Sequence, residues 1–300
     1  MIKKIKFTDY LWRVSLVIVI SASCKKTTRP ALGDYPQDHI VTPTTALRFY
    51  ASFDSSKPAD KQINILFGDS ISGYPSFFPN STITIGQGIH GTAFKGAGGT
   101  ALEYLNANDF SKSTSFTVAF WEKSTGVPQS ADGPQFVMSL VDKDYWHNSG
   151  MFLLFDHTGA GSTVDSAAVT FAVEDNWFVF HNNDRMPKIY DKQWHHIVFV
   201  YDQTKAKDPG GVGQGPLTTY VDGVAMTGLS KDATSAMSGP LTFNAASVSN
   251  LVLGGWNKHV NISGPTDPWI NSFPGSLDQV RFYNKVLSAS EVLALYNSKL

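Results

Sequence analysis

The chain of 300 residues contains a single cysteine, Cys24, so it cannot form an internal disulfide framework. Glutamate is also scarce, because only four of the 25 acidic residues are Glu and the rest are Asp. Aspartate favours turns, whereas glutamate favours helices. Together with 25 glycines and 15 prolines, this imbalance indicates a turn-rich β protein.

A clustered basic surface is absent as well. Residues 1–23 contain four of the 24 basic side chains and one of the 25 acidic ones, so the rest of the chain carries 20 basic and 24 acidic residues. The net charge of that part is −4 with its histidines neutral, and Lys and Arg form no stripe that could collect phosphates. We therefore expect no nucleic-acid partner.

The longest apolar run near the start, residues 14–20, is shorter than the roughly 20 residues of a membrane span. A basic leader precedes it, and small residues follow it at 21–23. This arrangement predicts an export signal peptide over residues 1–23. Cys24, directly after the cleavage point, resembles the lipid-acceptor cysteine of bacterial lipoproteins, although Ser21 stands where that motif usually has leucine. The alternative is a free thiol in an uncleaved anchor.

Residues 24–45 are predicted to be a flexible tether, since residues 25–45 carry three prolines and five threonines and have few apolar side chains. The lipoprotein resemblance implies membrane contact through a lipid anchor alone, at the bacterial outer membrane. Surface lipoproteins of Bacteroidetes-type bacteria often carry acidic residues after the cysteine, but Lys25 and Lys26 stand here. Both the periplasmic face and the cell surface therefore stay open.

The remaining 46–300 reads as one β domain. Short alternating or apolar runs recur between turn signals, and Asp222-Gly223 marks a hairpin. No long helical period appears before Ser288. The pattern predicts an all-β, antiparallel two-sheet jelly-roll sandwich with a short C-terminal helix. Clear strand candidates are residues 46–53, 116–121, 136–141, 151–155, 169–173, 177–180, 195–201, 218–221 and 251–253.

The last 28 residues are the most explicit. From Leu277 onward odd and even positions are expected to face opposite sides of a sheet, so that Leu277 and Gln279 share one face and Asp278 and Val280 the other. The sequence 288–291, Ser-Ala-Ser-Glu, fits a capping box at the start of a helix.

Several motifs occur in an order that resembles laminin-G-like domains. These are WHHIV at 194–198, YVDG at 220–223, LGG at 253–255 and FPGSLDQVRFYN at 273–284. The last block is similar to the bacterial branch of that group, within the concanavalin A-like lectin and glucanase superfamily. The resemblance covers residues 46–297 and implies two curved antiparallel sheets. Members of the superfamily bind sugars, cleave sugars, bind proteins or brace other domains, so the fold does not choose among them.

Aromatic side chains beside polar ones in the loops suggest glycan binding, because sugar C–H faces stack on aromatic rings while hydroxyls need polar partners. The alternative is that these rings cover the edges of the core, which we favour for Trp121 and Trp194 within or beside apolar strands. The predicted glycan-binding residues are Tyr145, Trp146, Trp177, Trp256, Asn257 and Trp269.

Catalysis is the weaker hypothesis. Glucanases of the superfamily carry E-x-D-x-x-E or E-x-D-x-E on one strand, and neither pattern occurs here. Glu122 and Glu174 lack acidic partners at suitable offsets, and Asp142 and Asp144 lie in a loop-like stretch. We therefore expect no glycosidase acid pair of the usual kind.

Metal binding is expected only for calcium. No HxxxH or HExxH spacing occurs, and the adjacent His195 and His196 face opposite ways on a strand, which argues against catalytic zinc. Related domains often hold one calcium near strand ends, and similarity to them points to Asp54 and Asp278 as ligands of a structural calcium. A turn cap or salt bridge is the alternative for Asp278.

The leading functional hypothesis is a lipid-anchored, non-catalytic carbohydrate-binding domain of the cell envelope that belongs to a polysaccharide-uptake system. Its partners would be a polysaccharide or glycan and another envelope lipoprotein. The alternatives are a glycoside hydrolase or polysaccharide lyase of the same superfamily, and a protein-interaction or bracing module.

Overall fold

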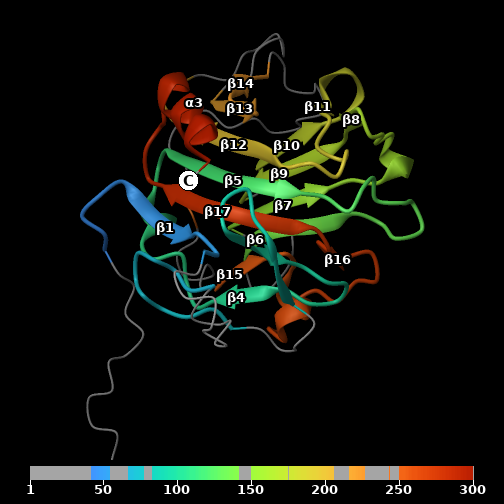
Figure 1. Ribbon diagram of the computed structural model, residues 1–300, viewed down its shortest axis with the longest axis horizontal. Coiled ribbons are helices and arrows are strands. Elements are labelled where there is room, and N and C mark those ends of the chain that lie inside the picture. Colours follow the sequence, from blue (N-terminus) through green and yellow to red (C-terminus); the bar gives the residue numbers. More distant parts are fainter. Residues whose placement is uncertain are drawn as a thin grey trace, which may run out of the picture. The chain divides into compact units, whose positions relative to one another are not determined.

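A computed structural model of the chain contains the two large sheets that the sequence predicts (Figure 1). It describes residues 42–54, 67–77, 83–141, 150–174, 176–205, 216–226, 243 and 250–299, all within the unit Ile40–Leu300. The predicted signal peptide, Cys24 and most of the tether lie outside these residues.

The first sheet has eight strands in the order β14-β13-β12-β5-β17-β3-β2, with β1 also paired to β17. Asp222-Gly223 joins β13 to β14, as its turn signal predicted. The strands are β1 (Leu47–Ala51), β2 (Thr84–Gln87), β3 (Thr92–Lys95), β5 (Phe116–Lys123), β12 (His195–Tyr201), β13 (Leu217–Val221), β14 (Val224–Ala225) and β17 (Ser276–Tyr283).

The second sheet has seven strands in the order β10-β9-β7-β6-β15-β4, with the short β16 added in parallel to β6. Its strands are β4 (Leu102–Tyr104), β6 (Gln135–Val141), β7 (Met151–Phe155), β9 (Val169–Val173), β10 (Asn176–Phe180), β15 (Asn250–Leu253) and β16 (Asn271–Ser272). A small two-stranded sheet pairs β8 (Ser166–Ala167) with β11 (Met186–Pro187). The short 3-10 helices are η1 (Phe110–Lys112), η3 (Thr158–Ala160), η4 (Asn182–Asp184) and η5 (Asn257–Val260).

The main core lies between the two sheets. Phe116, Val118 and Phe120 point into it from β5, which confirms the alternation predicted for that strand. On β7 the inward residues are Leu153 and Phe155, which belong to the same core. The outward residues of the second sheet instead form a separate aromatic cluster.

Alternation along β17 differs from the prediction. Leu277, Val280 and Phe282 all reach the main core, so Leu277 and Val280 share a face. The cause is an irregularity between Asp278 and Arg281 in the pairing with β5, where Gln279 has a φ of 51°. One extra residue in a bulge reverses the facing of everything that follows it.

Helix α3 (Ala289–Ser298) covers the outer face of the first sheet beside β12 and β13 (Figure 1). The capping box is present as predicted: the Glu291 N–H donates to Ser288 Oγ at 3.3 Å, and the Ser288 N–H donates to Glu291 Oε2 at 2.8 Å. Neither α3 nor another helix in the described part of the chain is long and apolar enough to cross a membrane.

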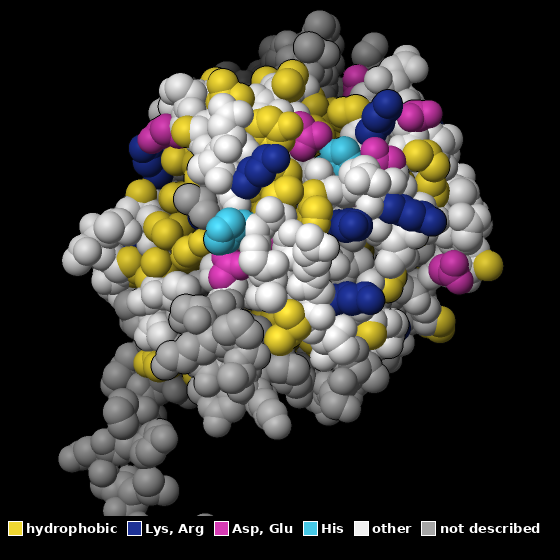
Figure 2. Space-filling view, in the orientation of Figure 1, with side chains coloured by type: hydrophobic (Ala, Val, Ile, Leu, Met, Phe, Trp, Pro, Cys, Tyr) yellow, Lys and Arg dark blue, Asp and Glu magenta, His cyan; other side chains and the backbone are white. Residues whose placement is uncertain are grey.

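Basic and acidic side chains are interspersed on the face of the molecule shown in Figure 2, and no continuous basic stripe crosses it.

Candidate functional site

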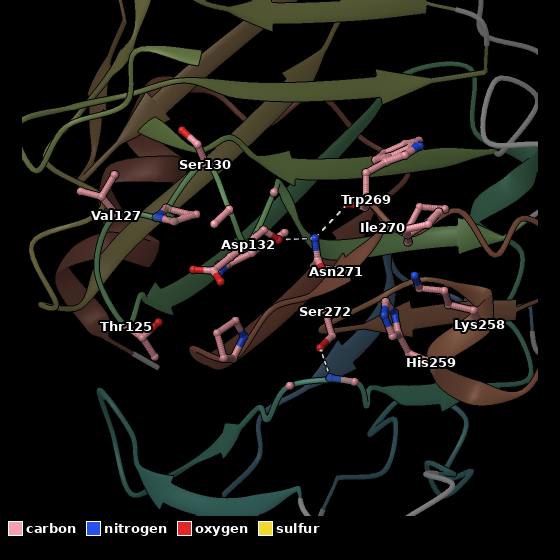
Figure 3. A pocket seen from close by; sticks show the side chains of 18 of the residues that line it. Thr125, Val127, Ser130, Asp132, Lys258, His259, Trp269, Ile270, Asn271 and Ser272 are labelled. Atoms are coloured by element: carbon pink, nitrogen blue, oxygen red, sulfur yellow. Dashed lines mark hydrogen bonds between the residues drawn. The ribbon is translucent and has the colours of Figure 1, made fainter. Parts of the chain in front are cut away.

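A groove of about 1020 Å³ lies where the loop between β5 and β6 faces the segment that carries Trp269. We call it the Trp269 groove. Figure 3 shows Val127, Ser130 and Asp132 on one wall, Trp269, Lys258 and His259 on the other, and Asn271 and Ser272 between them. Gly98 and Gly99, in the loop before β4, complete the lining.

Trp269 is the aromatic side chain that this groove presents. Its side chain is 36% exposed, and its ring centroid lies 5.9 Å from that of Phe136. The indole therefore packs on the protein and is still partly exposed at the groove. The predicted binding role of Trp269 is compatible with this placement.

Trp256 and Asn257 lie elsewhere. Both side chains are 0% exposed, and neither lines the groove. Trp256 packs 4.9 Å from Phe136 and 6.0 Å from Phe152, between ring centroids, as part of the outer aromatic cluster. These two predicted binding residues therefore present no surface to a ligand in this structure.

Trp177 belongs to the same cluster. It is half-buried, and its ring meets Phe152 edge-on at 5.3 Å between centroids. It does not line the groove. Tyr145 and Trp146, as well as Asp142 and Asp144, lie outside the described residues, so their roles stay predictions.

Asn271, which sequence reasoning missed, links the two walls of the groove. Its Nδ2 donates to the backbone oxygens of Trp269 (2.9 Å), Pro134 (3.3 Å) and Asp132. Gly133, with a φ of 69°, makes the approach possible, because a Cβ there would lie 2.9 Å from that same nitrogen. Asp132 and Asn271 are 139 positions apart in the chain, so no local signal connected them.

His259 fixes the turn that leads into the groove. Its Nδ1 accepts the Trp256 N–H at 3.0 Å, and its ring also bonds to the backbone of Ile270. Burial, followed by the neighbouring Lys258 charge, lowers the pKa of His259 to about 4. The ring is neutral at pH 7 and acts as a structural connector.

Asp132 is the only carboxylate among the described residues that line the groove. No hydrogen bond to its carboxylate oxygens was found within the described part of the chain, and its side chain is exposed. Two acceptor oxygens are thus available on the wall opposite Trp269.

A second site surrounds Asp278, the residue predicted as a calcium ligand. Its side chain is fully buried, its Oδ2 accepts the Ile89 N–H at 2.8 Å, and its Oδ1 accepts the Gln279 N–H at 2.8 Å. Burial, together with the nearby charge of Asp54, raises the pKa of Asp278 to about 8, in spite of the lowering by backbone N–H groups.

Asp54 completes this site from the end of β1. Its Oδ1 accepts the Thr92 N–H at 3.1 Å, and its Oδ2 accepts Gln279 Nε2 at 2.9 Å. The neighbours Phe53 and Gln279 have φ angles of 58° and 51°, which residues other than glycine rarely adopt. Strained backbone on both sides of a carboxylate pair is typical of a functional site.

A separate group of titratable residues contains Glu122, which faces His195 across the β5–β12 pair. Glu122 is fully buried, and neither carboxyl oxygen has a hydrogen-bond partner among the described residues. Burial, then Asp191 and Asp222, raises its pKa well above the usual range. Because its side chain is fully buried, Glu122 cannot reach a substrate in solution.

His195 lies between the two aspartates, with Nδ1 2.8 Å from Asp222 Oδ2 and Nε2 3.0 Å from Asp191 Oδ1. Burial lowers its pKa, but these two carboxylates outweigh burial and raise it. Within the described ranges, no three His, Cys, Asp or Glu side chains form a metal-binding group.

Comparison with known proteins gives a family match. A family model described as the concanavalin A-like lectin/glucanases superfamily matches residues 95–293. No curated protein sequence matches the chain.

Solved structures share the architecture. Domain 4 of an extracellular arabinanase from Geobacillus stearothermophilus, solved in complex with arabinotriose, has a TM-score of 0.51 and 16% identity, covering 83% of this chain and 98% of that one. A structure of botulinum neurotoxin type C, a toxin whose cell entry depends upon interaction with two ganglioside molecules, has a TM-score of 0.52 and 12% identity. It covers 85% of this chain and 51% of the toxin chain, so this chain spans about half of its length. At such identities the likeness concerns the fold.

Proposed function

We propose that this chain, which belongs to the concanavalin A-like lectin/glucanases superfamily, binds carbohydrate in the Trp269 groove. The observation that carries the proposal is the partly exposed indole of Trp269 in a groove whose opposite wall carries the exposed Asp132 carboxylate, while Trp256 of the same aromatic region is buried. An aromatic ring that is held by packing and is partly exposed can stack on sugar C–H groups.

The size of the groove suits more than one sugar unit. Its volume of about 1020 Å³ stands at the upper end of the range for small-molecule sites, roughly 300–1,000 Å³. The likeness to an arabinanase domain seen with arabinotriose is in keeping with an oligosaccharide ligand. The carbohydrate class is left to the binding measurements.

Binding without hydrolysis fits the groove better than a glycosidase does. Glycosidases place two carboxyl groups about 5–10 Å apart across the scissile bond. Asp132 is the only carboxylate among the described lining residues, and Glu122 is buried away from solvent. Release of reducing ends from any polysaccharide would favour the hydrolase alternative instead.

The decisive test is affinity electrophoresis over a broad polysaccharide panel, followed by calorimetry on the positive samples. Trp269→Ala should weaken binding about tenfold or more, since truncating an aromatic anchor costs about 2 kcal/mol. Leu293→Ala is the matched control, because Leu293 is also an exposed apolar residue but lies on α3. Unchanged binding by Trp269→Ala would refute the role of the groove.

A steric variant gives an independent test. A Cβ added at Gly98 meets nothing within 4 Å, and Gly98 does not have a positive φ. Gly98→Leu should therefore leave folding intact while its side chain enters the groove and blocks the ligand. Ala294→Leu, at an exposed position of α3, is the control that should bind normally.

We further propose a structural calcium held by Asp54 and Asp278. The donors fit in kind, since calcium prefers carboxylate and backbone oxygens. Three oxygens converge on Gly88, where a Cβ would lie 2.4 Å from Asp278 Oδ2, 2.5 Å from the His90 oxygen and 2.7 Å from the Thr92 oxygen. When bound, the ion would neutralise two neighbouring carboxylates, one of them fully buried.

Calorimetric titration with calcium should show one site that Asp54→Asn weakens and Asp165→Asn, at an exposed position, does not.

Lipid anchoring through Cys24 is also part of the proposal, with the outer membrane as its location. The basic leader, short apolar run and small residues before Cys24 support it. Labelled palmitate should enter the wild-type chain and not Cys24→Ser, and fractionation should place the labelled protein in the outer membrane. Equal labelling of both would exclude Cys24 as the acceptor.

Protease treatment of whole cells then distinguishes the surface from the periplasmic face, and crosslinking identifies a partner lipoprotein of an uptake system.

A further inference from the structure

Lys258 brings a cation onto the same wall of the groove as Trp269. Both residues line the groove, and Figure 3 shows them on the same side of it. Lys258 belongs to η5 and is half-buried, while its chain neighbours Asn257 and His259 are buried. The backbone that carries the lysine is therefore held in place by packing, and its side chain is presented to the groove from a fixed base.

The ammonium of Lys258 keeps hydrogen-bonding capacity for a ligand. Its Nζ donates to the backbone oxygen of Asp267 at 2.7 Å, which is its one hydrogen bond within the described part of the chain. An ammonium has three N–H donors, so two are left. Asp267 stands two positions before Trp269, and their Cα atoms are therefore at most about 7.6 Å apart. A short glycan can thus meet both the indole and the ammonium.

The positive charge of Lys258 is only partly compensated by the protein. Its bond goes to a neutral carbonyl, and burial lowers the pKa of Lys258 more than the charge of Asp267 raises it. A cation that has lost part of its water and has no carboxylate bonded to it is stabilised by an anionic ligand. Hydrogen bonds between an ammonium and a carboxylate are also stronger than those between neutral groups.

The opposite wall carries charges that are more exposed. Asp132 lines that wall, and its carboxylate can accept hydrogen bonds from sugar hydroxyls. Lys192 adjoins the same wall at Gly126, where a Cβ would lie 3.0 Å from the Lys192 Cε. Because Asp132 and Lys192 are both exposed, water and salt screen their charges. The half-buried Lys258 is therefore the stronger charged contact for a ligand on Trp269.

From these contacts we infer that the Trp269 groove binds glycans that contain uronic acids, and that Lys258 pairs with the carboxylate of the sugar at Trp269. Such a sugar offers a C–H face for the indole, a carboxylate for the ammonium and hydroxyls for Asp132. The inference rests on the proposed function and names its ligand class. We expect the free acid to bind at least about tenfold more tightly than its uncharged ester, which corresponds to about 1.4 kcal/mol.

The test compares uronic-acid oligosaccharides with their methyl esters on the full-length protein. The pairs come from homogalacturonan, alginate and glucuronan, and the two members of a pair have the same sugars and differ in charge. Neutral arabinan and β-glucan oligosaccharides complete the panel. Calorimetry should show that the wild type binds at least one free acid about tenfold or more tightly than its ester. This ratio should be larger at low salt than at physiological salt.

Three variants test the role of Lys258. Lys258→Gln keeps a donor for the Asp267 oxygen and removes the charge, so the ratio of acid to ester affinity should fall by about tenfold. Lys258→Arg keeps the charge and should keep most of the ratio. Lys112→Gln, at an exposed position outside the groove lining, is the matched control and should leave the ratio unchanged. Urea denaturation checks that each variant is folded.

The outcomes separate the two proposals. Binding of no glycan at all would overturn the proposed function and the inference with it. Binding of neutral glycans or esters that depends on Trp269 and equals or exceeds the binding of the acids would overturn only the inference. A ratio that stays constant in Lys258→Gln would also overturn it, by removing Lys258 as the partner of the carboxylate.

Discussion

Replacing Asp278 by asparagine should reverse its effect on stability between acid and neutral pH. In metal-free solution, we expect Asp278→Asn to unfold more easily than wild type at pH 4 and less easily at pH 7. The reason is that wild type holds a buried carboxyl that must stay protonated, whereas the amide carries no such requirement.

The magnitude follows from the pKa. Folding raises the pKa of Asp278 from 3.8 to about 8, first by burial and then by the charge of Asp54. A raised carboxyl pKa gives stability that is complete below pH 3.8 and is lost between pH 3.8 and 8, at about 1.4 kcal/mol per pH unit. At pH 7 the loss is about 4 kcal/mol.

Asparagine brings a penalty of its own. Both carboxyl oxygens of Asp278 accept backbone N–H groups, from Ile89 and Gln279, and an amide offers one acceptor oxygen. One buried N–H then loses its partner, which costs about 1–3 kcal/mol. The variant should thus be less stable by about 1–3 kcal/mol at pH 4 and more stable by about 1–3 kcal/mol at pH 7.

Urea denaturation in EDTA at a series of pH values measures this difference directly. Other titrating groups are common to both proteins, so they cancel in the comparison. Calcium should stabilise only the wild type, by about 2.7 kcal/mol at a hundredfold excess over Kd, and so offset the advantage of the variant at pH 7. If the free energies of unfolding of the two proteins change in parallel with pH, the pKa of Asp278 is not raised by burial and by Asp54, and the expectation is refuted.

Three further predictions concern other sites. Glu122→Gln should gain stability relative to wild type as pH rises above 4.5, by up to about 1.4 kcal/mol per pH unit, because burial raises the pKa of Glu122. A gain that does not grow with pH in urea titrations would contradict a raised pKa. Trp256→Ala should lower the free energy of unfolding by about 3–5 kcal/mol, because Trp256 is buried. Trp269→Ala should lower it by less than half as much and should lose glycan affinity. Equal losses of stability would mean that both rings are core residues. Gly133→Ala should weaken glycan binding and lower the free energy of unfolding, since the φ of 69° at Gly133 and the nearby Asn271 nitrogen leave no room for a Cβ. If calorimetry gives the variant the glycan affinity of the wild type, the contact between the groove walls does not matter for binding.

For the groove, the sequence selected a loop that lines it, but two of the side chains selected in that loop are buried. The 256–259 stretch was selected because an indole stands among polar residues, yet Lys258 and His259 line the groove while Trp256 and Asn257 are buried. Polar neighbours cannot tell on which side of a turn a ring points. That direction depends on packing against Phe136 and Phe152 of other strands.

Local patterns determined the elements of the fold. The Ser288–Glu291 capping box and the alternation of β5 depend on residues a few positions apart, and these predictions are confirmed. Even so, the bulge at Gln279 is invisible in the pattern, because the Gln279 side chain bonds to residues of the folded site: its Nε2 donates to Asp54 Oδ2, and its Oε1 accepts from Arg281.

The tertiary structure alone decided the sites. It brought Asn271 onto the backbone of Asp132 and placed the Asp54 charge beside the buried Asp278. Hydrogen bonds and burial between residues far apart in the chain set which side chains meet, which are hidden and which keep a free acceptor. Composition and motifs therefore determined the two-sheet fold, whereas long-range packing decided which side chains line the groove and which are buried.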